Sequence, residues 1–389
     1  MPRIAYIHSD DYANIVSRLP SNIDRSKKVH ALIEAYGLLR LRDLTIISPR
    51  KASIKELCRY HSRDYIEFLN KAEDYDSGEE TDDNSDIEED TTVTTRAHGK
   101  EDKLEEYGLR FDCSVFEGIA DYAAYVAGST LEAATLLCDD VFDIVIHWDG
   151  GRHHAKKDAA AGFCIVNDIV LGIMELQKAF DRVLYLDLDV HHGDGVESAF
   201  QFTDKVLTVS IHHYAEGFYP GTGSGVLSSA RTKAVVNIPM QAGLSDGTLS
   251  KVFDGMIEPL VKQFSPDAVV LQCGVDGMAG DPLGKWNLTM HGYSDCLKKV
   301  MAWKKPLLVL GGGGYNTVST ARCYAYLTSQ ILGRSILDEI PEHKYFEDYQ
   351  PDFLLFIDPG RQPDINTEEH LAHVRSLVDT QSKTLSSQH

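Results

Sequence analysis

The stretch RVLYLDLDVHHGDG (182–195) leads from an apolar run into a cluster of ionisable side chains. A continuous apolar run, rather than an alternating one, is typical of a strand in a parallel sheet that is covered on both faces. The chain holds eight such runs, and we expect each of them to form a strand. They are residues 3–9, 44–48, 142–148, 182–190, 205–211, 234–240, 267–274 and 306–314.

Amphipathic patterns with a helical period fill the gaps between these runs. Strands that alternate with helices predict an α/β fold: one doubly wound, three-layer domain with a central, mostly parallel sheet and helices on both faces. We assign residues 1–362 to this domain and expect a polar, frayed tail over 363–389. The helical patterns are residues 25–39, 117–138, 167–178, 248–263, 291–303 and 319–332.

The formal net charge of −21 is unevenly distributed along the chain. The run 73–90 carries eleven acidic residues and no basic one, so we interpret the low-complexity insert at about 73–105 as a solvated surface loop. An acidic surface repels nucleic acid, and no apolar run is long enough to span a bilayer. Seven scattered cysteines and a start without a signal-peptide pattern favour an intracellular, reducing compartment, the nucleus or the cytoplasm or both.

Polar clusters follow several of the expected strands, at the sheet edge where α/β proteins bind ligands. Side chains alternate along a strand, so Asp187, Asp189 and His191 share one face. Two buried carboxylates repel each other, and a cation relieves that conflict. Asp276, after the run 267–274, is the best third ligand and would leave an open position, as in catalytic zinc sites. Taken alone, the pair Asp189 and His191 could equally form a hydrogen-bonded polar network without a metal. The other polar clusters at the same edge favour a metal site.

A histidine pair and a tyrosine are the candidates for proton transfer and oxyanion binding. Asp187 and Asp194 are available to hold His153 and His154, and such carboxylates fix the imidazole tautomer and raise its basicity. The run GGGGY (311–315) brings backbone close to the site and offers the Tyr315 hydroxyl as a donor to a developing oxyanion. This glycine run lacks the context of a nucleotide-binding motif.

Together these clusters resemble the zinc-dependent histone deacetylase family, class I. The resemblance runs from about residue 3 to residue 360, and the segment EIPEHKYF (339–346) resembles the histone deacetylase 8-like branch and the related fungal Hos-type enzymes. It implies the arginase/deacetylase-type fold. The motifs that carry it are EYGLRFDC, GGRHHAKKDAAAGFCIVND, YLDLDVHHGDGVE, GFYPGTG, DPLGKWNLT, GGGGYN, TARCYAYLT and EIPEHKYFEDYQPDF.

The resemblance implies a role for each of these polar residues in zinc-dependent hydrolysis. His154 matches the general base and acid, His153 acts mainly through its charge, and Tyr315 polarises the acetyl carbonyl. The catalytic ion is Zn²⁺, for which Fe²⁺ or Co²⁺ can substitute, and a structural K⁺ accompanies it. The implied zinc ligands are Asp189, His191 and Asp276; Asp187 and Asp194 back the histidines; Asp187 and Ser210 lie near the K⁺.

The resemblance also implies a tunnel for the acetyl-lysine stem, a rim contact and a channel for acetate. Asp112 at the rim holds the substrate backbone, and Arg25 and Arg152 lie near the channel. Three positions depart from the expected pattern: Arg152 stands where most relatives have Trp, Tyr219 replaces the second tunnel Phe, and Leu283 replaces the Met of the histone deacetylase 8-like branch. The tunnel residues are Gly162, Phe163, Phe218, Tyr219 and Leu283.

The expected activity is hydrolysis of N6-acetyl-lysine in histone tails or other proteins, with a role in chromatin and transcription. Pro282 stands where co-repressor-bound relatives carry Arg, and Met290 where they have a basic neighbourhood, so we expect no obligatory inositol-phosphate or co-repressor complex. Two alternatives stay open: a deacetylase of acetylpolyamines or other small acetylated amines, and an inactive acetyl-lysine-binding scaffold. A two-manganese ureohydrolase such as arginase lacks ligands here, because Asp276 has no second acid at +2.

Overall fold

The computed structural model describes residues 2–77, 103–226, 229 and 231–386. Its centre is an eight-stranded sheet with the strand order β2-β1-β3-β8-β7-β4-β5-β6, and every neighbouring pair is parallel. Seven predicted runs contain one strand each, and the run 205–211 overlaps a strand that continues to His213, so the predicted α/β fold is confirmed. The strands are β1 (Ile4–Ile7), β2 (Leu44–Ile47), β3 (Ile144–His147), β4 (Val183–Asp187), β5 (Val206–His213), β6 (Val235–Met240), β7 (Ala268–Gln272) and β8 (Leu307–Leu310).

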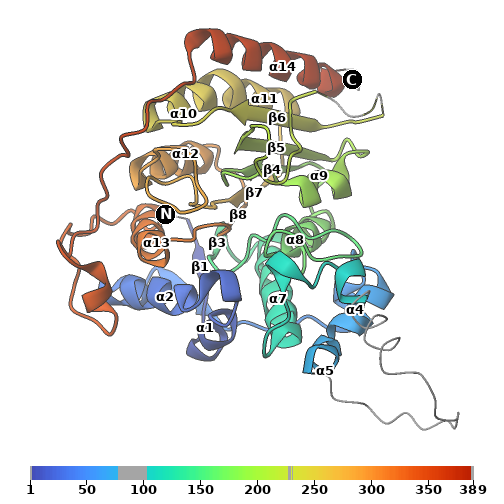
Figure 1. The fold of residues 1–389 in the computed structure, drawn as a ribbon. Helices are drawn as coiled ribbons and strands as arrows, with labels where there is room; N and C mark the ends of the chain where they lie inside the picture. The colour runs from blue at the N-terminus through green and yellow to red at the C-terminus, as the bar shows by residue number, and fades with distance from the viewer. Residues whose placement is uncertain (1, 78–102, 227–228, 230, 387–389) are drawn as a thin grey trace, which may run out of the picture.

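Helices cover both faces of this sheet (Figure 1). Alternate strand side chains point to opposite faces: Leu184 and Leu186 join one core cluster, whereas Val183 and Tyr185 join the other. The first cluster includes residues of α2 (Arg25–Ala35), α10 (Asp246–Val252), α11 (Glu258–Phe264), α12 (Met290–Ala302), α13 (Thr317–Ile331) and α14 (Glu368–Ser386). The second includes residues of α7 (Ile119–Cys138), α8 (Asp168–Leu176) and α9 (Asp194–Phe200).

A third core cluster lies where short helices pack on the outer side of α7. The sequence patterns did not predict these helices, because a helix of one or two turns is too short to establish a period. They are α1 (Asp10–Val16), α3 (Ile54–Leu57), α4 (Arg63–Leu69) and α5 (Ala72–Ser77). The predicted helix over 248–263 is α10 and α11 joined by a π-helical segment, Phe253–Ile257.

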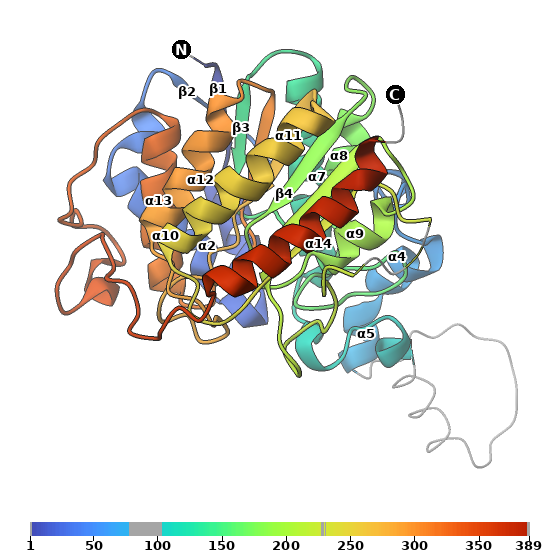
Figure 2. The same cartoon turned by 90° about the horizontal axis from the view of Figure 1, so that it is seen from above.

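The prediction of a frayed tail is wrong for residues 368–386, which form α14. Its buried side chains Leu371, Val374 and Val378 follow the helical spacing, and the helix packs against β6 and α11 (Figure 2). The polar residues between them lie on the outer face, which made the whole segment look like a solvated tail. Most of the predicted acidic insert, residues 78–102, lies outside the described residues.

The carboxyl ends of four central strands, β3, β8, β7 and β4, lie side by side in the sheet. Because these strands are parallel, the loops 148–167, 311–316, 273–289 and 188–193 leave the sheet at one edge. This edge is where the sequence places its polar clusters. In the described part of the chain, no helix has both the length and the apolar character needed to cross a membrane.

Candidate active site

Three predicted metal ligands meet at the ends of β4 and β7. His191 Nδ1 lies 3.1 Å from Asp189 Oδ1 and 2.9 Å from Asp276 Oδ2. All three residues are buried, and their ligand atoms lie within 4.8 Å of one another. Burial and the charge of Asp189 raise the pKa of Asp276, because two carboxylates share a dry site. Two oxygen donors, an imidazole and this repulsion fit a divalent cation.

Buried donors orient the two carboxylates of this cluster. Asp189 Oδ2 accepts hydrogen bonds from the Gly313 backbone at 2.8 Å and from Gln272 Nε2 at 3.1 Å. Asp276 Oδ1 accepts from the Val190 backbone at 2.9 Å. Outer contacts of this kind fix the direction in which ligand oxygens point. The cluster is therefore pre-organised by donors from two loops and from the end of β7.

The predicted histidine pair lies beside the metal cluster, and each ring is held by its predicted carboxylate. His153 Nδ1 contacts Asp187 Oδ2 at 2.8 Å, and His154 Nδ1 contacts Asp194 Oδ1 at 2.7 Å. The centroids of the two imidazole rings are 3.9 Å apart. His153 Nε2 also lies 3.8 Å from Asp189 Oδ1.

The two histidines have opposite pKa shifts. Burial lowers the pKa of His153, but the charges of Asp187 and Asp189 outweigh it and raise that pKa to about 9. Burial and the neighbouring charge of His153 lower the pKa of His154 to about 3. At neutral pH the pair therefore combines a charged imidazole with a neutral one that can accept a proton.

Tyr315 lies in the loop after β8, close to the metal cluster. Burial raises the pKa of its hydroxyl, so it remains a protonated donor at neutral pH. Asp281 Oδ2 accepts hydrogen bonds from the backbone of Tyr315 at 2.7 Å and of Asn316 at 3.2 Å, which fixes the loop. The Phe163 ring meets the Tyr315 ring edge-on, with the centroids 5.5 Å apart.

Aromatic rings cover the histidines from the solvent side. Phe218 stacks on His191 with centroids 5.1 Å apart and an interplanar angle of 2°, and Tyr219 meets the His154 ring at 4.9 Å and 86°. We call these rings the aromatic wall, and Gly162 lies against it. A Cβ at Gly162 would overlap the His154 ring and lie 2.8 Å from the Tyr219 hydroxyl. Only a glycine leaves room for both neighbours.

Other predicted binding residues are placed at the outer end of this wall. Asp112 is exposed, and its carboxylate accepts a hydrogen bond from the Gly162 backbone at 2.8 Å, so it supports the wall itself. Leu283 is 39% exposed on the loop that carries Asp281. Its assignment to the tunnel stays a prediction.

The residues predicted for the K⁺ site lie side by side in the sheet. Asp187 and Ser210 are register partners in β4 and β5. Asp187 Oδ2 accepts from the Tyr185 hydroxyl at 2.6 Å, and Ser210 Oγ accepts from the Gly193 backbone at 3.4 Å. Both residues are buried.

The two predicted channel arginines are buried next to the glycine loop. Arg25 Nη1 donates to the carbonyls of Gly312 at 2.9 Å and Gly314 at 3.1 Å. Arg152 Nη2 donates to the Asp149 carbonyl at 3.1 Å, and its guanidinium lies 6.0 Å from the centroid of the Tyr122 ring. Two buried positive charges therefore lie near the glycine loop 311–314.

Sequence reasoning missed Asp168, which holds the loop that carries the histidine pair. Its carboxylate accepts from the backbone of Gly151 at 3.0 Å and Arg152 at 2.7 Å and from the Thr130 hydroxyl at 2.6 Å. The dipeptide Asn167-Asp168 signals a helix start, and Asn167 does cap α8. That signal gives no indication of the contact with the loop, which arises only in the folded chain.

His61 was also missed, and it ties the two ends of the segment that carries Gly162 and Phe163. Its Nδ1 donates to the Lys157 carbonyl at 3.2 Å, and its Nε2 accepts from the Asn167 backbone at 3.0 Å. Burial lowers the pKa of His61 from 6.5 to about 4. The neutral ring is therefore part of the folded structure.

Because His61 is buried in its neutral form, we expect the free energy of unfolding to fall in weak acid. The variant His61→Gln should lack this contribution to the pH dependence. Between the two pKa values the unfolded chain binds more protons, so the free energy of unfolding falls as pH decreases below the unfolded pKa of 6.5. The contribution of His61 is about 2 kcal/mol between pH 6.5 and pH ~5. Urea unfolding at both pH values should show a smaller pH dependence in His61→Gln, whose amide makes the same two hydrogen bonds without titrating. An equal pH dependence in both proteins would contradict this assignment.

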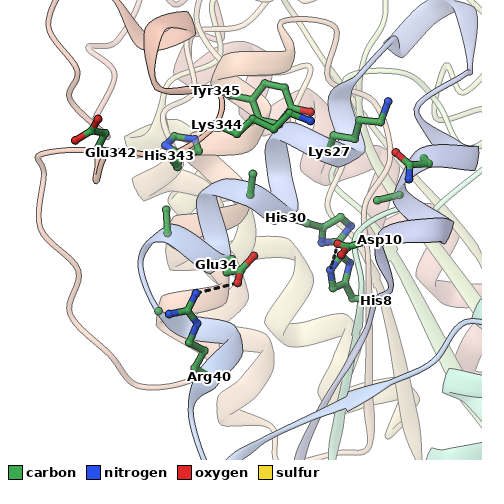
Figure 3. A pocket seen from close by; sticks show the side chains of 15 residues that line it. His8, Asp10, Lys27, His30, Glu34, Arg40, Glu342, His343, Lys344 and Tyr345 are labelled. Atoms are coloured by element: carbon green, nitrogen blue, oxygen red, sulfur yellow. Dashed lines mark hydrogen bonds and ion pairs between the residues drawn. The ribbon is translucent and has the colours of Figure 1, made fainter.

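A cavity of about 700 Å³ is lined by residues of α1, of α2 and of the segment 342–345 (Figure 3). His8 and His30 stand together at one end, with ring centroids 4.3 Å apart, and the ion pair Arg40–Glu34 lies at another. His30 also contacts Asp149, the residue whose carbonyl binds Arg152. None of the predicted metal ligands or proton-transfer residues is among the described residues that line this cavity.

Comparison with known proteins places this site in a family. The family model of the histone deacetylase domain matches residues 19–331. The chain is 44% identical to histone deacetylase 8 of Xenopus tropicalis over 376 residues, 96% of each protein. It is 43% identical to histone deacetylase 8 of Danio rerio over 378 residues, 96% of this chain and 94% of that protein. Histone deacetylase 8 of Xenopus laevis is 44% identical over 335 residues, 86% of this chain and 97% of that protein. The chain belongs to the histone deacetylase family.

Proposed function

We propose that this chain hydrolyses the N6-acetyl amide of lysine in histone tails or other proteins, in the nucleus, the cytoplasm or both. The observation that carries the proposal is the meeting of the Asp189–His191–Asp276 cluster with the histidine pair and Tyr315 at one sheet edge. The relatives named histone deacetylase 8 support the same activity. The products are acetate and free lysine, and regulation of chromatin is the expected role.

The metal chemistry belongs to the buried Asp–His–Asp cluster. A divalent ion bound there, which we propose to be Zn²⁺, supplies Lewis-acid polarisation of the amide carbonyl and lowers the pKa of water. We also propose K⁺ beside Asp187 and Ser210, where a buried carboxylate and a hydroxyl lie together. This K⁺ would stabilise the strand end from which the ligands Asp189 and His191 project.

The protein's own groups move the protons. His154, neutral at neutral pH, accepts the proton of the attacking water at Nε2 while Asp194 holds Nδ1. The same imidazole then donates that proton to the leaving lysine nitrogen. His153, which Asp187 holds at Nδ1, stabilises the negative charge that develops at the carbonyl oxygen. Tyr315 donates its hydroxyl to that oxygen.

The aromatic wall selects a neutral acylated side chain. Phe218, Tyr219 and Phe163 offer an apolar passage, and a charged lysine would lose its hydration there without a partner. Asp112 at the outer end is placed to accept hydrogen bonds from the substrate backbone as well as from Gly162. On the inner side, the buried Arg25 and Arg152 favour the acetate anion.

The test is acetate release by the purified chain, with metal content measured on the same sample. An acetyl-lysine histone-tail peptide, an acetylpolyamine and a longer acyl-lysine peptide are compared without added inositol phosphate or co-repressor. Turnover that is fastest on the peptide supports the proposal. Faster turnover of the acetylpolyamine would show that small acetylated amines, not proteins, are the substrates. Stoichiometric metal without any turnover would indicate an inactive acetyl-lysine-binding protein.

A further inference from the structure

The segment 214–226 carries the two rings Phe218 and Tyr219 that cover the site, and a buried histidine fixes its far end. His192 Nδ1 accepts a hydrogen bond from the Thr222 hydroxyl at 2.8 Å. The next residue of the segment, Gly223, accepts a hydrogen bond at its carbonyl from His212 Nε2 at 2.8 Å. The wall is therefore anchored just after the residues that form it.

His192 is in turn held by a carboxylate that two elements share. Its Nε2 donates to Glu197 Oε2 at 2.9 Å, and Glu197 lies in α9. The same oxygen accepts from Asn237 Nδ2 in β6 at 2.7 Å. His192 is 2% exposed and Asn237 is 7% exposed, whereas the Glu197 side chain is 21% exposed, so these hydrogen bonds are partly shielded from water.

The chain of contacts ends on the C-terminal helix. Gln381 of α14 is 1% exposed, and its amide makes both hydrogen bonds to the Asn237 backbone: Oε1 accepts from N at 2.8 Å, and Nε2 donates to O at 3.1 Å. A second contact joins α14 to the wall segment directly. A Cβ at Gly225 would lie 2.9 Å from Leu377 Cδ1, so the helix packs closely on the end of the segment.

We propose that the hydrogen-bond chain Thr222–His192–Glu197–Asn237–Gln381 positions the tunnel wall, so that α14 sets how tightly the site holds an acylated lysine stem. The inference rests on the proposed deacetylase function for its substrate and on the contacts above for its geometry. None of the five residues reaches the proposed metal ligands or the Tyr315 hydroxyl through a side-chain hydrogen bond in the described structure. They are positioning residues, and their loss should affect substrate binding more than the chemical step.

Matched pairs of variants test the chain at each link. Thr222→Val removes the hydroxyl at constant shape, whereas Thr222→Ser keeps it. Glu197→Ala removes the shared oxygen, whereas Glu197→Gln keeps one oxygen that accepts from both His192 and Asn237. Gln381→Ala releases the β6 backbone, and its neighbour Thr380→Ala alters only a hydroxyl that bonds within α14.

The measurements are KM and kcat on an acetyl-lysine peptide, metal content, and hydrogen exchange of the peptide that spans 214–226. The three disruptive variants should raise KM about tenfold with kcat within about threefold of wild type, since each loses a buried or partly buried hydrogen bond of the chain. They should also exchange faster over 214–226 and keep their metal, while the three matched variants resemble wild type.

Two results would overturn the inference. The first is a KM and an exchange rate over 214–226 that do not differ between the disruptive and the matched variants. The second is loss of kcat together with metal, which would mean that His192 supports the ligand His191 rather than the wall. If wild type hydrolyses no acyl-lysine peptide, the proposed function fails, and the exchange rates still decide whether these contacts hold the wall.

Discussion

Tyr315→Phe lowers kcat for acetyl-lysine hydrolysis by about 10²- to 10³-fold, the usual loss for one oxyanion donor. The hydroxyl is the only group that the substitution removes, and burial keeps it protonated in the wild-type site. The ring stays in place because its edge contact with Phe163 and the Asp281 hydrogen bond to its backbone do not involve the hydroxyl. KM and metal content should therefore change little.

The control for this variant is Tyr326→Phe. Tyr326 loses a hydroxyl that contacts His291 outside the site, and its kcat should equal that of wild type. Steady-state kinetics with metal analysis on all three proteins gives the comparison. A Tyr315→Phe enzyme with at least a third of wild-type kcat would show that the hydroxyl does not stabilise the oxyanion.

Gly313→Ala removes the metal and, with it, at least about 10²-fold of the activity. A Cβ at Gly313 would overlap Asp276 Oδ2 and lie 2.8 Å from Asp189 Oδ2, so two ligands must move at once. The φ of Gly313 lies outside the left-handed region, so an alanine is compatible with the backbone. The damage is therefore confined to the ligand carboxylates, and the chain should still fold.

The matched control is Gly247→Ala in α10, where nothing lies within 4 Å of the added methyl group. Titration of each purified apoprotein with Zn²⁺ should give a Kd for Gly313→Ala at least about 10²-fold weaker than for wild type and for Gly247→Ala. Circular dichroism and the unfolding midpoint verify the fold. Wild-type metal affinity in Gly313→Ala would show that Asp189 and Asp276 are not the ligands.

The fold could be predicted from the sequence because its strands are buried on both faces. Runs such as 182–190 and 267–274 are continuously apolar and end in polar residues, which locates both the strand and the edge where ligands bind. Helix α14 could not be predicted in this way. Its buried stripe is narrow, and what makes it a helix in the folded protein is β6, which lies more than 100 residues earlier in the chain.

The part of the candidate site that depends on short-range spacing and on strand order could be predicted from the sequence. Asp189 and His191 are two residues apart on one strand end, and Asp276 follows a neighbouring parallel strand. Asp168 and His192 were not assigned, because their partners come from loops and helices whose mutual positions only the folded chain defines. Such supporting contacts have no spacing rule in the sequence.

Helix α14 also solves a problem of self-association that every open sheet has. β6 is the last strand of the sheet, and an uncovered edge of this kind offers free backbone groups to a strand from another molecule. Gln381 occupies the amide and carbonyl of Asn237 as a partner strand would, and His370 contacts the Pro239 carbonyl at 3.2 Å. Pro239 itself has no N–H to offer. The C-terminal helix thus keeps the sheet from growing, and a chain shortened before it would expose an aggregation-prone edge.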